Sequence, residues 1–89
     1  MAKKRRKLNK DFEKKIYSSK KNVELVLAKI YDIDDEDIQK EYISAFNRVL
    51  NLYDELKENY DQQGFNETSE DLLSNYKNAF DLFESEFEI

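Results

Sequence analysis

Hydrophobic residues recur at intervals of three or four along most of the chain, which is the spacing of one face of an α-helix. The first such segment covers residues 8–31. Its apolar stripe consists of Leu8, Phe12, Ile16, Val23, Val26, Leu27 and Ile30. Ser19 falls on the same stripe and leaves a polar gap next to Ser18. The pattern favours a single helix but leaves open a kink, or a split into two helices, near Ser18-Ser19.

The second segment covers residues 35–62 and carries two adjacent apolar stripes. One consists of Ile38, Tyr42, Ala45, Val49, Leu52 and Leu56, and the other of Ile43, Phe46, Leu50 and Tyr53. The helix opens at Asp34 or Asp35, and Asp34 as N-cap would place Ile33 and Ile38 at the positions of a hydrophobic staple. We expect a central helix with neighbours on two sides, ended by Gly64, because glycine readily adopts the left-handed conformation.

The third segment covers residues 69–88, and its stripe consists of Leu72, Leu73, Tyr76, Ala79, Phe80, Phe83 and Phe87. Thr68 is expected to cap this helix, with Asp71 at the third helical position. Connections this short make neighbouring helices antiparallel. The sequence therefore predicts an all-α fold, a small antiparallel three-helix bundle. A single domain of residues 8–89 would form it, behind a mobile basic N-terminal tail of residues 1–7.

Four residue types are absent from the 89 residues: Pro, Cys, His and Trp. Without cysteine there is no disulfide, so we expect an intracellular, cytoplasmic protein, and no apolar run is long enough for a membrane span. The missing histidine removes the commonest general base and metal ligand. The acidic run 32–37 does not match a calcium loop, whose sixth and twelfth positions would be Asp37 and Ile43. We therefore expect a non-enzymatic protein with no metal and no cofactor.

Charge is divided unevenly along the chain. Residues 1–31 hold eleven basic residues against three acidic ones, whereas residues 32–89 hold four against seventeen, within a net charge of −5. One interpretation is internal neutralisation, in which a basic first helix lies against acidic ones. A second is nucleic-acid binding by the tail and first helix. Its residues would be Lys3, Lys4, Arg5, Arg6, Lys7, Lys10, Lys14 and Lys15.

The third interpretation, our leading hypothesis, is that the acidic helices bind a partner protein with a basic surface. The expected contact residues are Asp34, Asp35, Glu36, Asp37, Glu70, Asp71, Asp81, Glu84 and Glu86. Leu25 and Leu82 lie off the apolar stripes, which suggests a contact strip for a partner. A second copy of the chain, forming a homodimer, would cover the same strip.

In size and helical class the chain is similar to small helical immunity proteins of bacteriocin producers, to phage-encoded inhibitors and to small helical antitoxins. The similarity is one of size and class, and no sequence motif carries it. Heavy use of Lys, Asn, Ile and Tyr is typical of A+T-rich coding sequences. Together these features favour an inhibitor, immunity or antitoxin-like factor of a low-GC bacterium, phage or plasmid.

Overall fold

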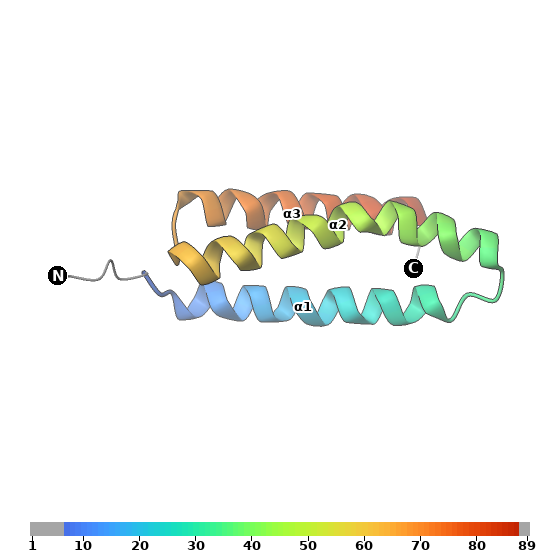
Figure 1. Cartoon of the computed structure of the whole chain (residues 1–89), viewed down its shortest axis with the longest axis horizontal. Coiled ribbons are helices and arrows are strands. Elements are labelled where there is room, and N and C mark those ends of the chain that lie inside the picture. Colours follow the sequence, from blue (N-terminus) through green and yellow to red (C-terminus); the bar gives the residue numbers. More distant parts are fainter. Residues whose placement is uncertain (1–6, 88–89) are drawn as a thin grey trace.

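A computed structural model describes residues 7–87, and within them it contains three α-helices and no strand. The helices are α1 (Lys10–Tyr31), α2 (Glu36–Gln63) and α3 (Glu67–Phe87). Consecutive helices are antiparallel, so α1 and α3 run in the same direction in an elongated bundle of 57 × 21 × 18 Å (Figure 1). The predicted all-α three-helix bundle is confirmed. The predicted tail lies outside the described residues, apart from Lys7.

The first helix begins two residues later than the hydrophobic pattern suggests. Asn9 is its N-cap, and the side-chain oxygen accepts a hydrogen bond from the Phe12 N–H at 3.0 Å. Leu8 therefore precedes the helix and is 63% exposed, so its assignment to the apolar stripe is wrong. The helix runs without interruption through Ser19, which is buried and whose hydroxyl donates to the Lys15 carbonyl at 2.8 Å. This bond satisfies the hydroxyl inside the helix, so Ser19 requires no break.

The second helix is capped by Asp35 rather than by Asp34. The Asp35 carboxylate accepts a hydrogen bond from the Ile38 N–H at 3.2 Å, so the expected hydrophobic staple does not form. Instead, the Gln39 side-chain amide donates to carbonyls in the last turn of α1, including that of Tyr31 at 3.2 Å. These carbonyls lack partners within their own helix. Gln39 thus ties the start of α2 to the end of α1.

The turn between α2 and α3 depends on Gly64, which ends α2 as predicted. Its φ of 77° is positive, but its ψ of −162° lies outside the expected left-handed helical conformation. The residue that caps α3 is Asn66, not Thr68. The Asn66 side chain accepts from the Ser69 N–H at 2.9 Å, and the Asn66 N–H donates to the Ser69 hydroxyl at 2.8 Å. This reciprocal pair satisfies two backbone donors at once, as a capping box does. Thr68 lies inside α3, which begins at Glu67, so it does not hold the cap position, and Ser69 is completely buried.

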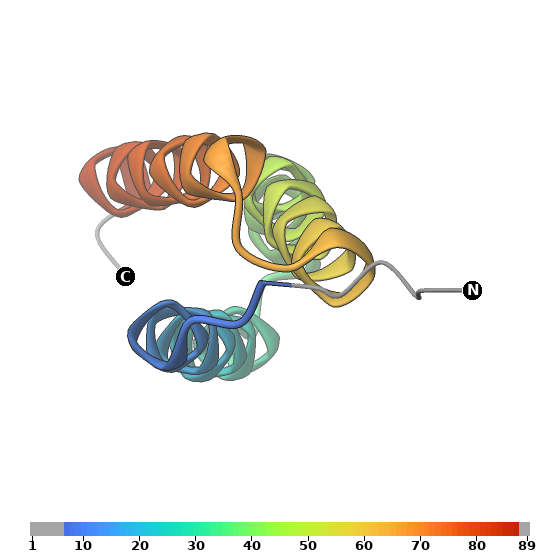
Figure 2. The ribbon, with the colours of Figure 1, turned by 90° about the vertical axis from the view of Figure 1, so that its left-hand side faces the viewer.

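Aromatic residues dominate the contact between α2 and α3. Phe46 is fully buried, with its ring centroid 4.8 Å from that of Phe83. The buried hydrophobic residues are Phe12, Ile16, Val23, Val26, Ile30, Phe46, Val49, Tyr53, Leu56, Tyr60, Leu73, Tyr76 and Phe83. On α2 this set draws on both predicted stripes, because the helix packs against two neighbours. Viewed from its end, the bundle shows α2 beside α3 and α1 standing further from α3 (Figure 2).

Candidate functional site

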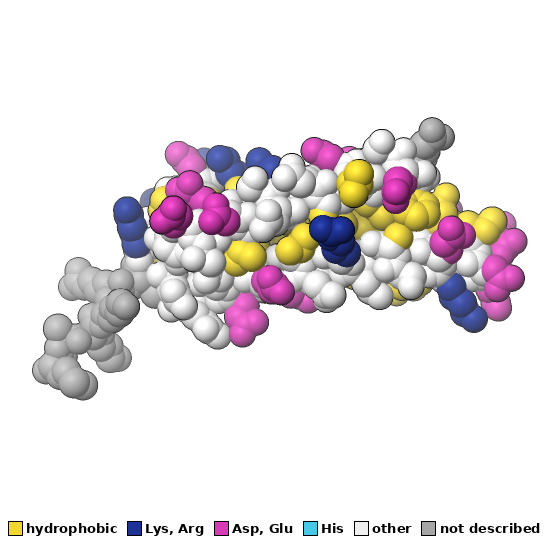
Figure 3. Space-filling view, turned by 90° about the horizontal axis from the view of Figure 1, so that it is seen from above, with side chains coloured by type: hydrophobic (Ala, Val, Ile, Leu, Met, Phe, Trp, Pro, Cys, Tyr) yellow, Lys and Arg dark blue, Asp and Glu magenta, His cyan; other side chains and the backbone are white. Residues whose placement is uncertain are grey.

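Apolar side chains remain uncovered along the outer seam between α2 and α3. Ile38, Ala45 and Leu52 follow one another at intervals of seven and therefore form a line along α2. Ile38 is 42% exposed, and Leu82, on the α3 side of the seam, is 58% exposed. Figure 3 shows the resulting band of hydrophobic side chains running lengthwise on this face. We call this band, with the carboxylates around it, the acidic–apolar surface.

A shallow hollow lies in the middle of the acidic–apolar surface. It is lined by Arg48, Asn51, Leu52, Asn75, Asn78, Ala79 and Leu82. Its asparagine amides can both donate and accept hydrogen bonds, whereas the Arg48 guanidinium only donates. The floor thus combines apolar contact area with polar groups that fix orientation, a combination found at protein interfaces.

Carboxylates surround the apolar band where α2 begins and α3 ends. The Tyr42 hydroxyl donates to the Phe87 carbonyl at 3.4 Å, so the start of α2 lies beside the end of α3, and Glu41 and Glu86 are each one residue from this contact. The run 34–37 lies just beyond, and acidic side chains gather at that end of the molecule (Figure 3). Within residues 7–87, none of these carboxylates forms an ion pair. The surface therefore presents uncompensated negative charge around apolar side chains.

The structure divides the nine predicted carboxylates into separate groups, although all of them are exposed. Residues 34–37 and Glu86 belong to the acidic–apolar surface. Asp81 and Glu84 instead line a hollow between α1 and α3. Glu70 and Asp71 lie at the start of α3, about 20 Å from Glu84 at 1.5 Å per residue.

Two residues of the acidic–apolar surface were not predicted from the sequence to belong to a binding surface. Ile38 was assigned to the core, and Glu41 was not singled out. The interval of seven that links Ile38 to Ala45 and Leu52 is visible in the sequence. The position of the end of α3 is not visible there, and it is this end that leaves Ile38 uncovered.

The predicted basic residues also divide into groups. Lys10 lies exposed on the outer side of α1. Lys14 is exposed at the edge of that side and also lines one hollow between α1 and α3, whereas Lys15 lines two hollows there. Lys7 is held at the α2–α3 turn, where its carbonyl accepts from the Phe65 N–H and its ammonium lies 5.8 Å from the Phe65 ring centroid. Lys3, Lys4, Arg5 and Arg6 lie outside the described residues.

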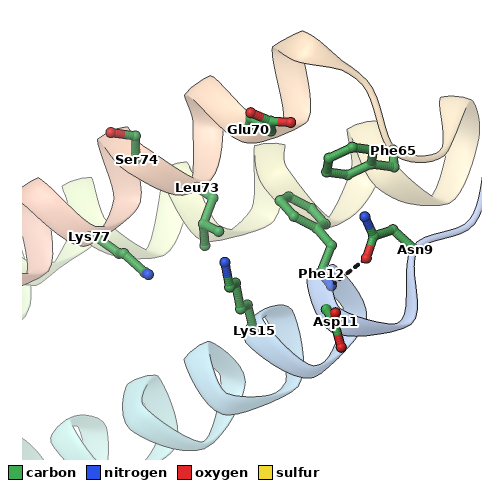
Figure 4. A pocket seen from close by; sticks show the side chains of 9 residues that line it. All are labelled: Asn9, Asp11, Phe12, Lys15, Phe65, Glu70, Leu73, Ser74 and Lys77. Atoms are coloured by element: carbon green, nitrogen blue, oxygen red, sulfur yellow. Dashed lines mark hydrogen bonds between the residues drawn. The ribbon is translucent and has the colours of Figure 1, made fainter.

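A hollow of about 450 Å³ separates the first halves of α1 and α3. Its lining residues are Asn9, Asp11, Phe12, Lys15, Phe65, Glu70, Leu73, Ser74 and Lys77. Lys15 and Lys77 reach into it from opposite helices, with Leu73 between them (Figure 4). Phe12 and Phe65, with ring centroids 5.1 Å apart, close one end. The arrangement suits a negatively charged group with an apolar body, but carboxylates on the same rim compete for the two ammonium groups.

One hydrogen bond joins α1 to α3 across the adjoining hollow, where the Tyr76 hydroxyl donates to the Ser19 carbonyl at 3.2 Å. Burial raises the pKa of Tyr76 to about 12, although the side chain of Ser19 acts in the opposite direction. Tyr76 therefore keeps its proton at physiological pH and serves as a permanent donor. The small side chain of Ser19 leaves room for this aromatic ring, which explains the polar gap in the α1 stripe.

Neither metal-site geometry nor sequence relatives assign a function. Among the residues that the structure describes, no three acidic side chains lie close enough together to hold a metal ion. In the same part of the chain, no helix has the length and apolar character to cross a membrane. Comparison with protein-family models, curated proteins and solved structures found no match. Function is therefore inferred from the surfaces of this chain.

Proposed function

We propose that this protein is a non-enzymatic module that binds a partner protein through the acidic–apolar surface. The observation that carries the proposal is the exposed apolar band of Ile38 and Leu82, bordered by carboxylates without ion pairs within residues 7–87. Apolar contact supplies affinity, while the carboxylates accelerate encounter with a basic partner and disfavour acidic ones. An inhibitor, immunity or antitoxin-like factor of a low-GC bacterium, phage or plasmid would act in this way. The absence of cysteine supports a cytoplasmic setting.

The chemistry of the surface limits what the partner looks like. Lysine or arginine side chains of the partner would face Glu41, Glu86 and the run 34–37, and apolar side chains would cover Leu82. In the central hollow, Arg48 requires an acceptor, such as a backbone carbonyl or a single carboxylate. The fitting partner is thus a basic surface with an apolar centre, rather than a uniformly charged one.

Site-specific photocrosslinking tests this assignment. A photoreactive residue at position 82 should capture a discrete protein from a nuclease-treated lysate of a low-GC bacterium. The same residue at position 25 should not, although Leu25 and Leu82 are similarly exposed, at 62% and 58%. Capture at position 25 alone, or equally at both positions, would contradict the proposal.

Charge reversal gives a second readout on the same surface. The double variant Glu41→Lys, Glu86→Lys should abolish capture at low salt. High salt should have the same effect on the native chain, because it screens the carboxylates. The matched control Asp54→Lys, Glu84→Lys changes the charge equally, with one substitution on each of the same two helices. Asp54 follows Leu52 by two residues and so lies on the other side of α2, and Glu84 lines the hollow between α1 and α3. The control should retain the partner. Equal loss in both variants would mean that net charge, not this surface, determines binding.

A further inference from the structure

The outer side of α1 carries a row of positive charge that the proposed protein interface does not use. Lys10, Lys14, Tyr17 and Lys21 are spaced by four, three and four residues, which places them on one side of the helix. This side faces away from the buried residues of α1, and all four side chains are exposed. We call these four residues the lysine row.

The carboxylates of α1 are turned away from the lysine row or stand at its end. Glu13 accepts a hydrogen bond from the Tyr60 hydroxyl of α2, and Asp11 lines the hollow facing α3. Glu24 is the remaining acid of the helix; it follows Lys21 by three residues and so stands at the C-terminal end of the same row. Within residues 7–87, the three lysines of the row form no ion pair. Their charge is thus available to an external anion.

The acidic helices balance only part of this charge, at Lys14, which lines the same hollow as Asp81 and Glu84 of α3. Figure 2 shows α2 and α3 together on one side of the molecule and α1 on the other. A helix with its side chains is about 10–12 Å across, whereas electrostatic interactions decay over about 8 Å at physiological ionic strength. Carboxylates on the far side of α2 and α3 therefore act on a ligand at the row only weakly.

Tyr17 gives the row a second chemical property. Its side chain is 59% exposed, and the Lys21 ammonium lies 5.0 Å from its ring centroid. An exposed aromatic ring among lysines is the arrangement on which unpaired nucleic-acid bases stack while ammonium groups contact phosphates. From Lys10 to Lys21 the row spans about 16 Å at 1.5 Å per residue.

We propose that the lysine row of α1 binds single-stranded nucleic acid, with Lys10, Lys14 and Lys21 on phosphates and Tyr17 stacked on a base. This site lies on the opposite side of the bundle from the acidic–apolar surface. The two binding sites can therefore be tested independently of each other. Binding through phosphates and stacking carries no sequence preference.

Fluorescence anisotropy with the full chain tests the site, using fluorescein-labelled dT20, U20 and a 20-base-pair duplex as probes. The variant Lys10→Glu, Lys14→Glu, Lys21→Glu should weaken single-strand binding at least tenfold. It should also reduce the slope of log affinity against log salt by about 2, at 0.7 per lost phosphate contact. The matched control Lys40→Glu, Arg48→Glu, Lys57→Glu makes the same charge change on α2, away from the hollow that Lys14 lines, and should bind far more tightly than the row variant. Equal weakening in both variants overturns the proposal.

Substitutions of Tyr17 separate stacking from simple charge attraction. Tyr17→Ala should weaken single-strand binding about fivefold or more, and Tyr17→Phe should restore it. Tyr31→Ala removes an equally exposed aromatic, 64% exposed, from the end of the same helix and should have no effect. If the duplex binds as tightly as dT20 and Tyr17→Ala is neutral, the single-strand assignment is wrong. Circular dichroism of each variant confirms that the helices remain intact.

Discussion

The pair α2–α3 and the single helix α1 are held in the bundle in different ways. Between α2 and α3, aromatic rings meet repeatedly, as in Phe46 with Phe80 and Phe83, and Tyr53 with Tyr76. Helix α1 contributes one buried aromatic, Phe12, and otherwise aliphatic side chains such as Val23 and Ile30. Its hydrogen bonds to the rest of the bundle lie near its two ends and at Ser19. All three helices thus share one core, to which α2 and α3 supply most of the aromatic rings and α1 chiefly aliphatic side chains.

The same two regions differ in charge. Helix α1 carries six lysines and three acidic residues, whereas α3 carries one lysine and six acidic residues. No ion pair joins α1 to α3 within residues 7–87. The helix that supplies chiefly aliphatic side chains to the core is therefore also the one whose charge is left for external ligands. This comparison separates the residues that hold the fold from those assigned to binding.

The largest expected effect comes from the aromatic core of α2 and α3. Phe46→Ala removes a fully buried ring and leaves a cavity, so we expect a loss of about 3–5 kcal/mol in the free energy of unfolding. Chemical denaturation measures it. Leu82→Ala, on the exposed outer seam, should change the free energy by no more than about 0.5 kcal/mol. Similar losses in both variants would remove the distinction between core and surface.

The hydrophobic pattern was sufficient to predict this core, since Phe46, Tyr76 and Phe83 all lie on expected stripes. It failed at the helix ends, where polar side chains compete for the same backbone groups. Asp34 and Asp35 are equivalent by residue type, and only the folded turn selects Asp35. Capping geometry, unlike periodicity, depends on one or two torsion angles that the pattern does not specify.

Gly64 tests the turn that joins the two tightly packed helices. Its φ of 77° and ψ of −162° lie in a region open almost only to glycine, so Gly64→Ala should cost about 1–3 kcal/mol. The corresponding variant in the other turn, Asp34→Ala, alters an exposed side chain and should cost no more than about 0.5 kcal/mol. Thermal unfolding of the two variants gives the comparison. If Gly64→Ala is neutral, the turn tolerates another conformation.

A smaller effect is expected where α1 meets α3. Tyr76→Phe deletes the hydrogen bond to the Ser19 carbonyl and should cost about 1 kcal/mol at neutral pH. Tyr17→Phe, at an exposed site on α1, is the matched control and should cost less. Amide hydrogen exchange should rise chiefly around Ser19 in the Tyr76 variant. A uniform rise in all three helices would show that α1 does not open separately.

Alkaline pH acts on the same contact. The pKa of Tyr76 is raised from 10.0 to about 12 in the folded protein, mainly by burial. Between these values the unfolded chain has already released the proton that the folded chain retains, so the free energy of unfolding falls as pH rises. The contribution of protonated Tyr76 to the free energy of unfolding is fully present below pH 10. Tyr76→Phe should make this decline shallower, and an unaltered decline in that variant would contradict the assignment.

The candidate sites were predictable only in outline. The charge division of the chain is plain in the sequence, and it singled out Lys10, Lys14 and the run 34–37. Which charges share a surface depends on helix rotation and register. The contact between Tyr42 and Phe87 places the start of α2 beside the end of α3, with Glu41 and Glu86 next to it, and helix rotation places Lys15 in two hollows facing α3 and Lys14 in one. Both are set by packing contacts between distant parts of the chain.

The smallest expected effect is that of salt on stability. Internal neutralisation would make attraction between α1 and the acidic helices part of the folding free energy, and salt would then weaken the bundle. Exposed charges without ion pairs contribute little to stability. We therefore expect the free energy of unfolding to change by less than about 0.5 kcal/mol between low and high salt, in denaturation curves recorded at both.

The variant Lys10→Ala, Lys14→Ala, Lys21→Ala should be equally neutral. A stability that falls steeply with salt in the native chain but not in this variant would show that the lysines hold α1 in place. Salt-independent stability combined with salt-sensitive binding would instead assign the charge of α1 to its ligand.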